Sequence, residues 1–176
     1  MRPYLFTLFI LNLFCCIPLN AQDSATTIIL VRHAEKATTP GDDPQLSEEG
    51  LARAEMLSRM FENSGLTAIY ATQYIRTRKT AEPIAHKLGL QVQTVDAGAS
   101  KKLVEAIVTR HQGGTVLVVG HSNTLPEIIQ ALSGGKVFEI ADDDYDNLYV
   151  VTLTQKGKGK TIRMKFFTGA VDQVCK

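Results

Sequence analysis

Short apolar runs alternate along the chain with stretches in which apolar residues recur every three or four positions. The apolar runs predict buried strands at residues 26–31, 68–71, 90–95 and 115–119. Helical spacing predicts one helix that begins at a cap at Ser47 and three more at residues 76–88, 101–111 and 123–132. Strands and helices in this order predict an α/β fold, a three-layer α/β/α sandwich with a mainly parallel central sheet.

The end of the chain has a different pattern. Residues 148–154 and 161–167 read as two strands joined by the turn QKGKGK, which predicts an antiparallel hairpin at the edge of the sheet. No internal repeat interrupts the chain. We therefore expect a single domain over residues 22–176.

The first 21 residues have the features of a leader. Arg2 precedes an apolar run that is shorter than the ~20 residues of a membrane-spanning helix, and Asn12 and Pro18 interrupt it. This pattern predicts a signal peptide cleaved after Ala21, so that the protein is exported, periplasmic or secreted, and is not inserted in the membrane after cleavage. Cleavage would leave Cys175 as the single thiol, which excludes an internal disulfide.

Charge gives little general attraction for other macromolecules. The chain has 19 basic and 18 acidic residues, and loss of Arg2 with the leader would leave 18 of each. A formally neutral domain is not expected to bind nucleic acid or anionic membranes. Any anion must then be bound at a local site.

Four polar residues gather where predicted strands end. Arg32 and His33 follow the first buried strand, His121 follows Gly120 at the end of another, and Arg76 comes soon after the short strand at 68–71. Ligands of parallel sheets bind at the carboxyl ends of the strands, so we expect these four side chains to share one rim. A lone histidine there is more often a cap or a core residue, but this set suits a phosphoryl group, because imidazole can attack phosphorus and guanidinium groups can hold its oxygens. Asn123 is interpreted either as a helix cap or as a ligand contact.

These segments resemble the motifs of the histidine phosphatase superfamily, also called phosphoglycerate-mutase-like. The first motif is seen in LVRHAEK, the second in Thr72, Arg76 and Thr80, the third in GHSNT, and LSEEGLARAEML is similar to the first helix of the family. The resemblance implies that His33 is the nucleophile and that Arg32, Arg76 and His121 bind the phosphoryl group, with Thr72 in the binding set. It implies no metal and no cofactor, and the short chain is similar to the compact bacterial branch.

Other assignments are less direct. The general acid of the family falls by position at Asp96, and Glu35, close to the nucleophile, is the rival. Lys36 is either a further phosphate contact or a solvated lysine. The acidic run at residues 141–146 is interpreted as a solvated turn rather than as a rim of the site.

The sequence therefore predicts a phosphomonoester hydrolase that acts on a small-molecule phosphomonoester through a metal-independent phosphohistidine on His33. Two alternatives stay open: a phosphate- or phosphoester-binding module with little turnover, and a phosphatase of phosphohistidine in proteins. A mutase is disfavoured because a chain of this length leaves little for a lid that shields the phosphoenzyme from water. The sequence predicts neither the substrate nor the oligomeric state.

Overall fold

A computed structural model describes residues 25–136, 138–154 and 159–166 of the chain. The predicted leader, its cleavage site, Cys175 and most of the QKGKGK turn lie outside the described residues. Within these ranges no helix is long and apolar enough to cross a lipid bilayer.

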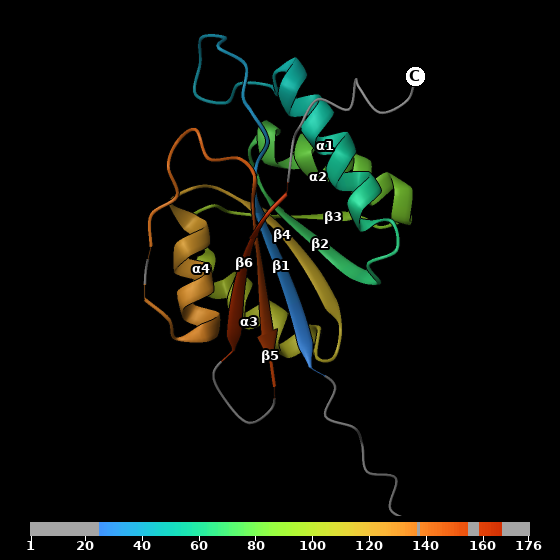
Figure 1. The fold of residues 1–176 in the computed structure, drawn as a ribbon, viewed down its shortest axis with the longest axis vertical. Coiled ribbons are helices and arrows are strands. Elements are labelled where there is room, and N and C mark those ends of the chain that lie inside the picture. Colours follow the sequence, from blue (N-terminus) through green and yellow to red (C-terminus); the bar gives the residue numbers. More distant parts are fainter. Residues whose placement is uncertain (1–24, 137, 155–158, 167–176) are drawn as a thin grey trace, which may run out of the picture.

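The described chain folds into one mixed sheet with helices on both faces (Figure 1). The strands run in the spatial order β3-β2-β4-β1-β5-β6, with bounds β1 Thr26–Arg32, β2 Leu66–Thr72, β3 Val92–Val95, β4 Thr115–Gly120, β5 Asn147–Leu153 and β6 Lys160–Lys165. The first four strands are parallel, and β5 and β6 are antiparallel to β1 and to each other. The predicted α/β sandwich with a C-terminal edge hairpin is confirmed.

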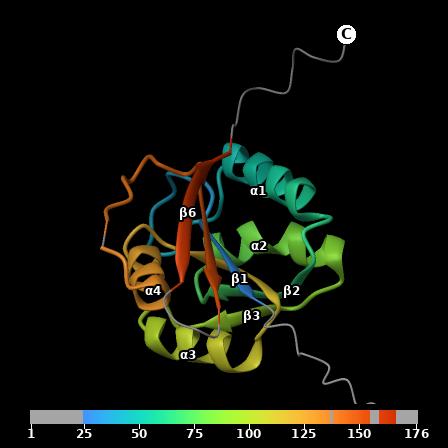
Figure 2. The same cartoon turned by 60° about the horizontal axis from the view of Figure 1, so that its bottom comes forward.

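The helices form two pairs, one on each face of the sheet (Figure 2). Helices α1 (Glu48–Phe61) and α2 (Ile75–Leu88) cover one face, where Ile29 and Val31 of β1 point. Helices α3 (Ser100–Arg110) and α4 (Thr124–Ser133) cover the other face. β1 is apolar on both faces, as expected of a central strand covered on both sides. The carboxyl end of this buried strand leads directly to His33.

Local chemistry explains most of the element ends. The Ser47 hydroxyl accepts a hydrogen bond from Gly50 N at 3.1 Å and so caps α1 as predicted. Gly89 and Gly134, with φ near +65° and +68°, end α2 and α4. Strand β3 begins at Val92 rather than at residue 90, because the Leu90 amide is used to close α2 on the Ala85 carbonyl at 2.9 Å.

Candidate active site

The two histidines meet at the carboxyl ends of neighbouring parallel strands. Arg32 of β1 is paired with Gly120 of β4, and the His33 amide donates to the Gly120 carbonyl at 2.9 Å. This register brings the next residue of each strand together, with 5.3 Å between the ring centroids of His33 and His121. Both residues are buried, at 4% and 7% exposure, so neither ring is freely hydrated.

The ring of His33 is fixed by its own backbone. Its Nδ1 lies 2.8 Å from the Ala34 carbonyl oxygen, which can only accept, so Nδ1 carries the proton and Nε2 keeps its lone pair. Burial lowers the pKa of His33 to about 3, opposed by this hydrogen bond and reinforced by the charges of His121, Arg32 and Arg76. The imidazole is therefore neutral near pH 7 and has one defined nucleophilic nitrogen.

The ring of His121 is fixed from another strand. Its Nε2 lies 2.8 Å from the Thr72 hydroxyl, which lies 2.9 Å from the Thr77 hydroxyl. Thr77 donates to the Tyr74 carbonyl at 2.8 Å, so it accepts from Thr72, and the Thr72 oxygen accepts from His121 Nε2–H. Burial first, and then Arg76 and Arg32, lower the pKa of His121 to about 4, while Asp43 opposes this.

Arg32 is a buried guanidinium with an unused donor. Its Nη1 donates to the Ala141 carbonyl at 2.8 Å, and its Cζ lies 4.2 Å from the centroid of the Tyr145 ring. Its Nε is buried without a hydrogen-bond partner among the described residues. A buried donor without an acceptor costs about 1–3 kcal/mol, so Arg32 is suited to a ligand that supplies an oxygen.

Arg76 lies in the first turn of α2 and is held by a loop residue. The Asp43 carboxylate accepts from the Ile75 amide at 2.9 Å and lies 3.4 Å from Arg76 Nη1. The guanidinium also lies 4.3 Å from the centroid of the Tyr74 ring, which packs edge-on against His121 at 5.2 Å. The Asp43 carboxylate is thus bound both by the N-terminus of α2 and by an arginine, and these two groups together form a favourable anion-binding site.

The loop after His33 is anchored to α1. Glu35, whose side chain is 12% exposed, forms an ion pair with Arg53 of α1, which is buried at 6% exposure. A Cβ at Gly50 would come within 2.2 Å of the Glu35 carbonyl oxygen, so only glycine permits this approach. Burial would raise the pKa of Glu35, but hydrogen bonds from Arg53 more than offset this and lower it. A carboxylate kept ionised in this way is poorly suited to donate a proton.

The remaining predicted residues lie around this centre. Asp96 is exposed after β3, accepts from Gly98 N at 2.7 Å, and lines a small cavity together with Thr72 and Gly120. Lys36 is exposed and shares with Arg76 the lining of a separate cavity of about 390 Å³. Asn123 is exposed at the N-cap position of α4, where its side chain makes no capping hydrogen bond. Among the described residues no group of three or more His, Cys, Asp or Glu side chains gathers closely enough to hold a metal ion.

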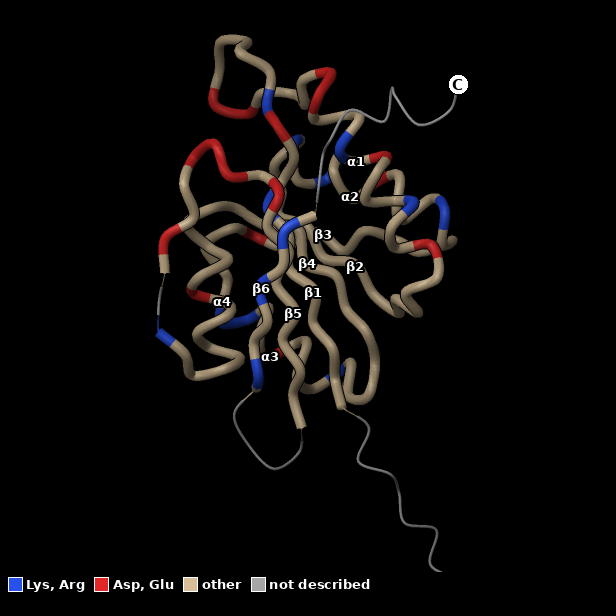
Figure 3. The backbone as a smooth tube through the Cα atoms, viewed as in Figure 1, with Lys and Arg blue, Asp and Glu red and all other residues tan. Residues whose placement is uncertain are grey.

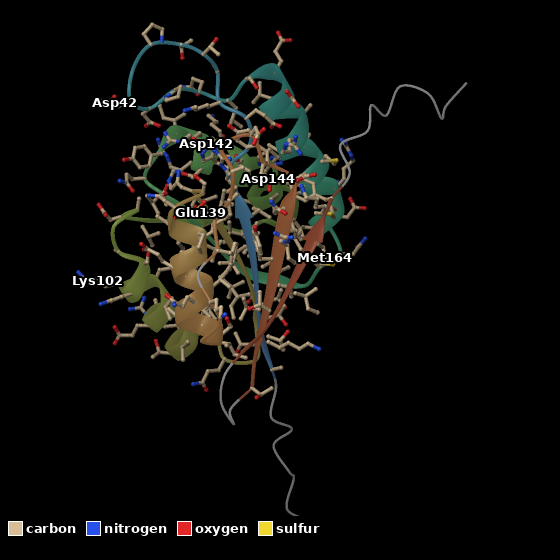
Figure 4. The ribbon with its side chains drawn as sticks, turned by 60° about the vertical axis from the view of Figure 1, so that its left-hand side comes forward. Asp42, Lys102, Glu139, Asp142, Asp144 and Met164 are labelled. Atoms are coloured by element: carbon tan, nitrogen blue, oxygen red, sulfur yellow. The ribbon has the colours of Figure 1, made fainter. Side chains whose placement is uncertain are left out.

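Asp142 and Asp143 form an exposed turn, as predicted, but the prediction that residues 141–146 do not border the site needs correction. This segment lies beyond the carboxyl end of β1, where Figure 4 labels Asp142 and Asp144. It contacts Arg32 through the Ala141 carbonyl and the Tyr145 ring, and that ring lies 6.0 Å from the ring of His33. The acidic composition suggested hydration, whereas the long-range contacts make the segment a wall of the site.

Sequence reasoning also missed the residues that hold the arginines and His121. Asp43 lies in an irregular loop, directly after Gly41 and Asp42. Tyr74 and Thr77 lie at the start of α2, where the sequence has no unusual feature. Tyr74 and Thr77 had one signal, their proximity in sequence to Arg76. Asp43 had none, because its contact with Arg76 joins residues 33 positions apart.

Comparison with known proteins gives a partial match to one family and a shared fold. A model of the histidine phosphatase superfamily (branch 1) matches residues 28–97, a segment that contains Arg32, His33 and Arg76. No curated protein sequence matches the chain significantly.

Solved structures with the same fold cover most of the domain. A structure titled mycobacterial hydrolase 2 is 13% identical, covers 83% of this chain and 94% of its own, and has a TM-score of 0.67. The protein histidine phosphatase SixA complexed with tungstate is 18% identical, with 79% and 96% covered and a TM-score of 0.63. YhfR of Bacillus stearothermophilus is 19% identical, with 77% and 94% covered and a TM-score of 0.64. The predicted resemblance to the histidine phosphatases is therefore confirmed.

Proposed function

We propose that this chain, which has the histidine phosphatase fold and matches that superfamily over residues 28–97, is a phosphomonoester hydrolase that works through a covalent phosphohistidine on His33. The observation that carries the proposal is the state of His33: a buried, neutral imidazole whose Nδ1–H is bound to the Ala34 carbonyl. This state makes Nε2 a nucleophile without prior loss of a proton. No step requires a metal ion.

Substrate binding is the task of the two arginines and His121. Arg32 and Arg76 supply guanidinium donors to the phosphoryl oxygens, and the unpartnered Nε of Arg32 gains an acceptor when the phosphoryl group enters. The anion raises the proton affinity of His121, whose Nε2–H stays on Thr72, so that its Nδ1 can take up a proton and donate to the phosphoryl group. These donors stabilise the charge of the transition state.

The reaction then runs in two displacements. His33 Nε2 attacks phosphorus, a P–N bond forms, and the P–O bond to the alcohol breaks while an acid protonates the leaving oxygen. Water next attacks the phosphohistidine, its proton passes to the same group, the P–N bond breaks, and phosphate and neutral His33 are released. We assign the acid to Asp96 rather than to Glu35, since Arg53 keeps Glu35 ionised.

Trapping the intermediate tests this mechanism. The purified protein is mixed with a ³²P-labelled phosphomonoester in excess chelator and quenched in alkali, in which a P–N bond survives. We expect label on His33 and steady phosphate release, and loss of both in His33→Ala. A binding module with little turnover would release no phosphate. Full activity in His33→Ala, or abolition by chelator, would show that the mechanism is wrong.

His86→Ala is the matched control. His86 is an exposed histidine on α2, so its removal takes away an imidazole of the same kind without touching the site. Label and turnover in this variant should equal those of the wild type.

A further inference from the structure

An acidic cavity adjoins the proposed phosphoryl site. Its volume is about 520 Å³, and five carboxylates line it: Glu35, Glu49, Asp143, Asp144 and Asp146. Tyr145 is the shared wall, since it lines this cavity and its ring also lies 6.0 Å from that of His33. The volume is within the range of pockets that hold small ligands. The alcohol of a bound phosphomonoester therefore has an acidic space beside it.

The positive charges of this cavity are already engaged. Its two cationic side chains are Arg53, paired with Glu35, and Lys165, which lies 2.9 Å from Asp144 and 2.7 Å from Asp146. Five carboxylates less two cations leave a net charge of −3 in the lining. Burial would raise the pKa of Asp144, but the hydrogen bond from Lys165 and the charge of that ammonium group lower it, so this carboxylate is ionised at neutral pH.

Carboxylates also accompany both arginines of the phosphoryl site. Asp43 lies 3.4 Å from Arg76, and Asp142 lies 3.8 Å from Arg32. Figure 3 shows the acidic residues of these two loops gathered beyond the carboxyl ends of the strands. With both histidines neutral, the formal charges of the two arginines are balanced by Asp43 and by Asp142, whose side chain is 99% exposed. The field around the site therefore gives a polyanionic substrate no attraction.

A ligand is nevertheless expected on Arg32. Its side chain is 6% exposed, and its Nε has no hydrogen-bond partner among the described residues. The same guanidinium contacts Ala141, Asp142 and Tyr145 of the acidic loop. A phosphoryl group bound by Arg32 thus lies next to the acidic cavity, and an ammonium group a few bonds from phosphorus would reach the carboxylates.

We propose that the preferred substrates are aminoalkyl phosphates, phosphomonoesters whose alcohol carries a positive charge close to the phosphate. The assignment rests on the proposed phosphatase function. The two arginines bind the phosphoryl oxygens, and the five carboxylates of the acidic cavity attract the ammonium group. Substrates with a second anionic group are disfavoured by the same charges.

A charge series on one two-carbon spacer tests the preference. Choline phosphate is compared with its uncharged carbon analogue, 3,3-dimethylbutyl phosphate, and with the anionic 2-carboxyethyl phosphate. One charge interaction of this kind at a partly exposed site should lower kcat/KM about 5-fold at each step, which corresponds to about 1 kcal/mol. The differences in kcat/KM between the three compounds should become smaller as the salt concentration is raised. Equal kcat/KM for the first two compounds would overturn the inference.

Variants locate the effect. Glu49 is 72% exposed and Asp143 is exposed, so Glu49→Gln/Asp143→Asn removes two charges with little risk to the fold. The choline-to-neutral ratio should drop to about 2 in this variant. Glu105→Gln, which neutralises an exposed carboxylate on α3 that does not line the cavity, should keep the wild-type ratio.

Two further substrates distinguish failure of the charge preference from failure of the phosphatase assignment. p-Nitrophenyl phosphate carries no positive charge and reports phosphatase activity alone. If the protein hydrolysed it but showed no charge preference in the series, the substrate preference would be overturned and the phosphatase assignment would stand. Failure to hydrolyse any of these esters would refute the phosphatase assignment itself. A lysine-flanked phosphoserine peptide is run against its alanine-flanked counterpart, and a larger ratio for this pair would show that the cation belongs to a peptide rather than to a small alcohol.

Discussion

The ends of β1 and β4 carry the same residue in the same setting and hold it in different ways. Both strands are buried, both are followed by histidine, and the two rings lie 5.3 Å apart. His33 is held by the carbonyl of the next residue, whereas His121 is held by a hydroxyl 49 positions away in β2. A local hydrogen bond fixes one ring, and the tertiary fold fixes the other.

This difference separates the proposed roles of the two rings. Because Nδ1–H of His33 is used by the backbone, its free nitrogen is a lone pair, which suits attack on phosphorus. Because Nε2–H of His121 is used by Thr72, its other nitrogen can take up a proton and donate to the phosphoryl group. Under the proposed function, similar burial thus serves a nucleophile at one strand end and a hydrogen-bond donor at the other.

Substitution of each histidine in turn tests this separation of roles and should give the largest effect. His33→Ala removes the nucleophile, and no phosphoenzyme should form. His121→Ala removes one donor to the transition state, so kcat/KM should fall about 10³-fold, or about 4 kcal/mol, while label still accumulates slowly on His33. Rapid-quench labelling and steady-state kinetics check this. Absence of label in a folded His121→Ala protein would show that the two rings do not have separate roles.

The anchoring of the β1 end to α1 gives the next effect. Glu35→Gln leaves Arg53, which is 6% exposed, with only the exposed Glu49 carboxylate at 3.8 Å as a charged partner, and this should lower the free energy of unfolding by about 3 kcal/mol in urea titrations. Glu82→Gln breaks the exposed pair with Lys79 and is the matched control, with an expected change within about 0.5 kcal/mol. Equal losses in the two variants would show that the Glu35–Arg53 pair does not anchor the loop.

The same contrast between local and distant contacts marks how far the sequence could be interpreted. The strands, the Ser47 cap and the glycine stops of α2 and α4 follow from residues within a few positions of each other. The meeting of His33 and His121 follows from two buried strands that end at one rim. The roles of Asp43 and Tyr145 could not be predicted, because polar loop residues look alike in sequence until the fold brings them against an arginine.

The depressed pKa values of the two rings give a smaller effect, on stability against pH. In the unfolded chain a histidine has a pKa near 6.5, whereas folded His33 and His121 titrate at about 3 and about 4. At pH values between the folded and the unfolded pKa, the unfolded chain binds protons that the folded chain does not. The free energy of unfolding therefore decreases as the pH falls below about 6.5. At pH 5 each ring should cost about 2 kcal/mol.

Urea titrations at pH 7 and pH 5 measure this loss. His33→Gln should lose about 2 kcal/mol less than the wild type between the two pH values, because contributions from carboxylates cancel in the difference. The exposed His86→Gln variant should lose as much as the wild type. An identical loss in His33→Gln would mean that the pKa of His33 is the same in the folded and unfolded chains, and burial would not be what keeps this ring neutral.

The hydroxyl that holds His121 gives the smallest effect and tests the distant contact most directly. Thr72→Val keeps the shape of a side chain that is 6% exposed but removes the acceptor of His121 Nε2–H. The ring then keeps its place without a fixed orientation, so kcat/KM should fall about 10-fold, or about 1.4 kcal/mol, with little change in KM. Thr67→Val, on the same strand but exposed and bonded to the Thr115 carbonyl, should stay within about twofold of the wild type. If Thr72→Val were as active as Thr67→Val, packing alone would orient His121, and the two strand ends would differ in geometry but not in the way they control their histidines.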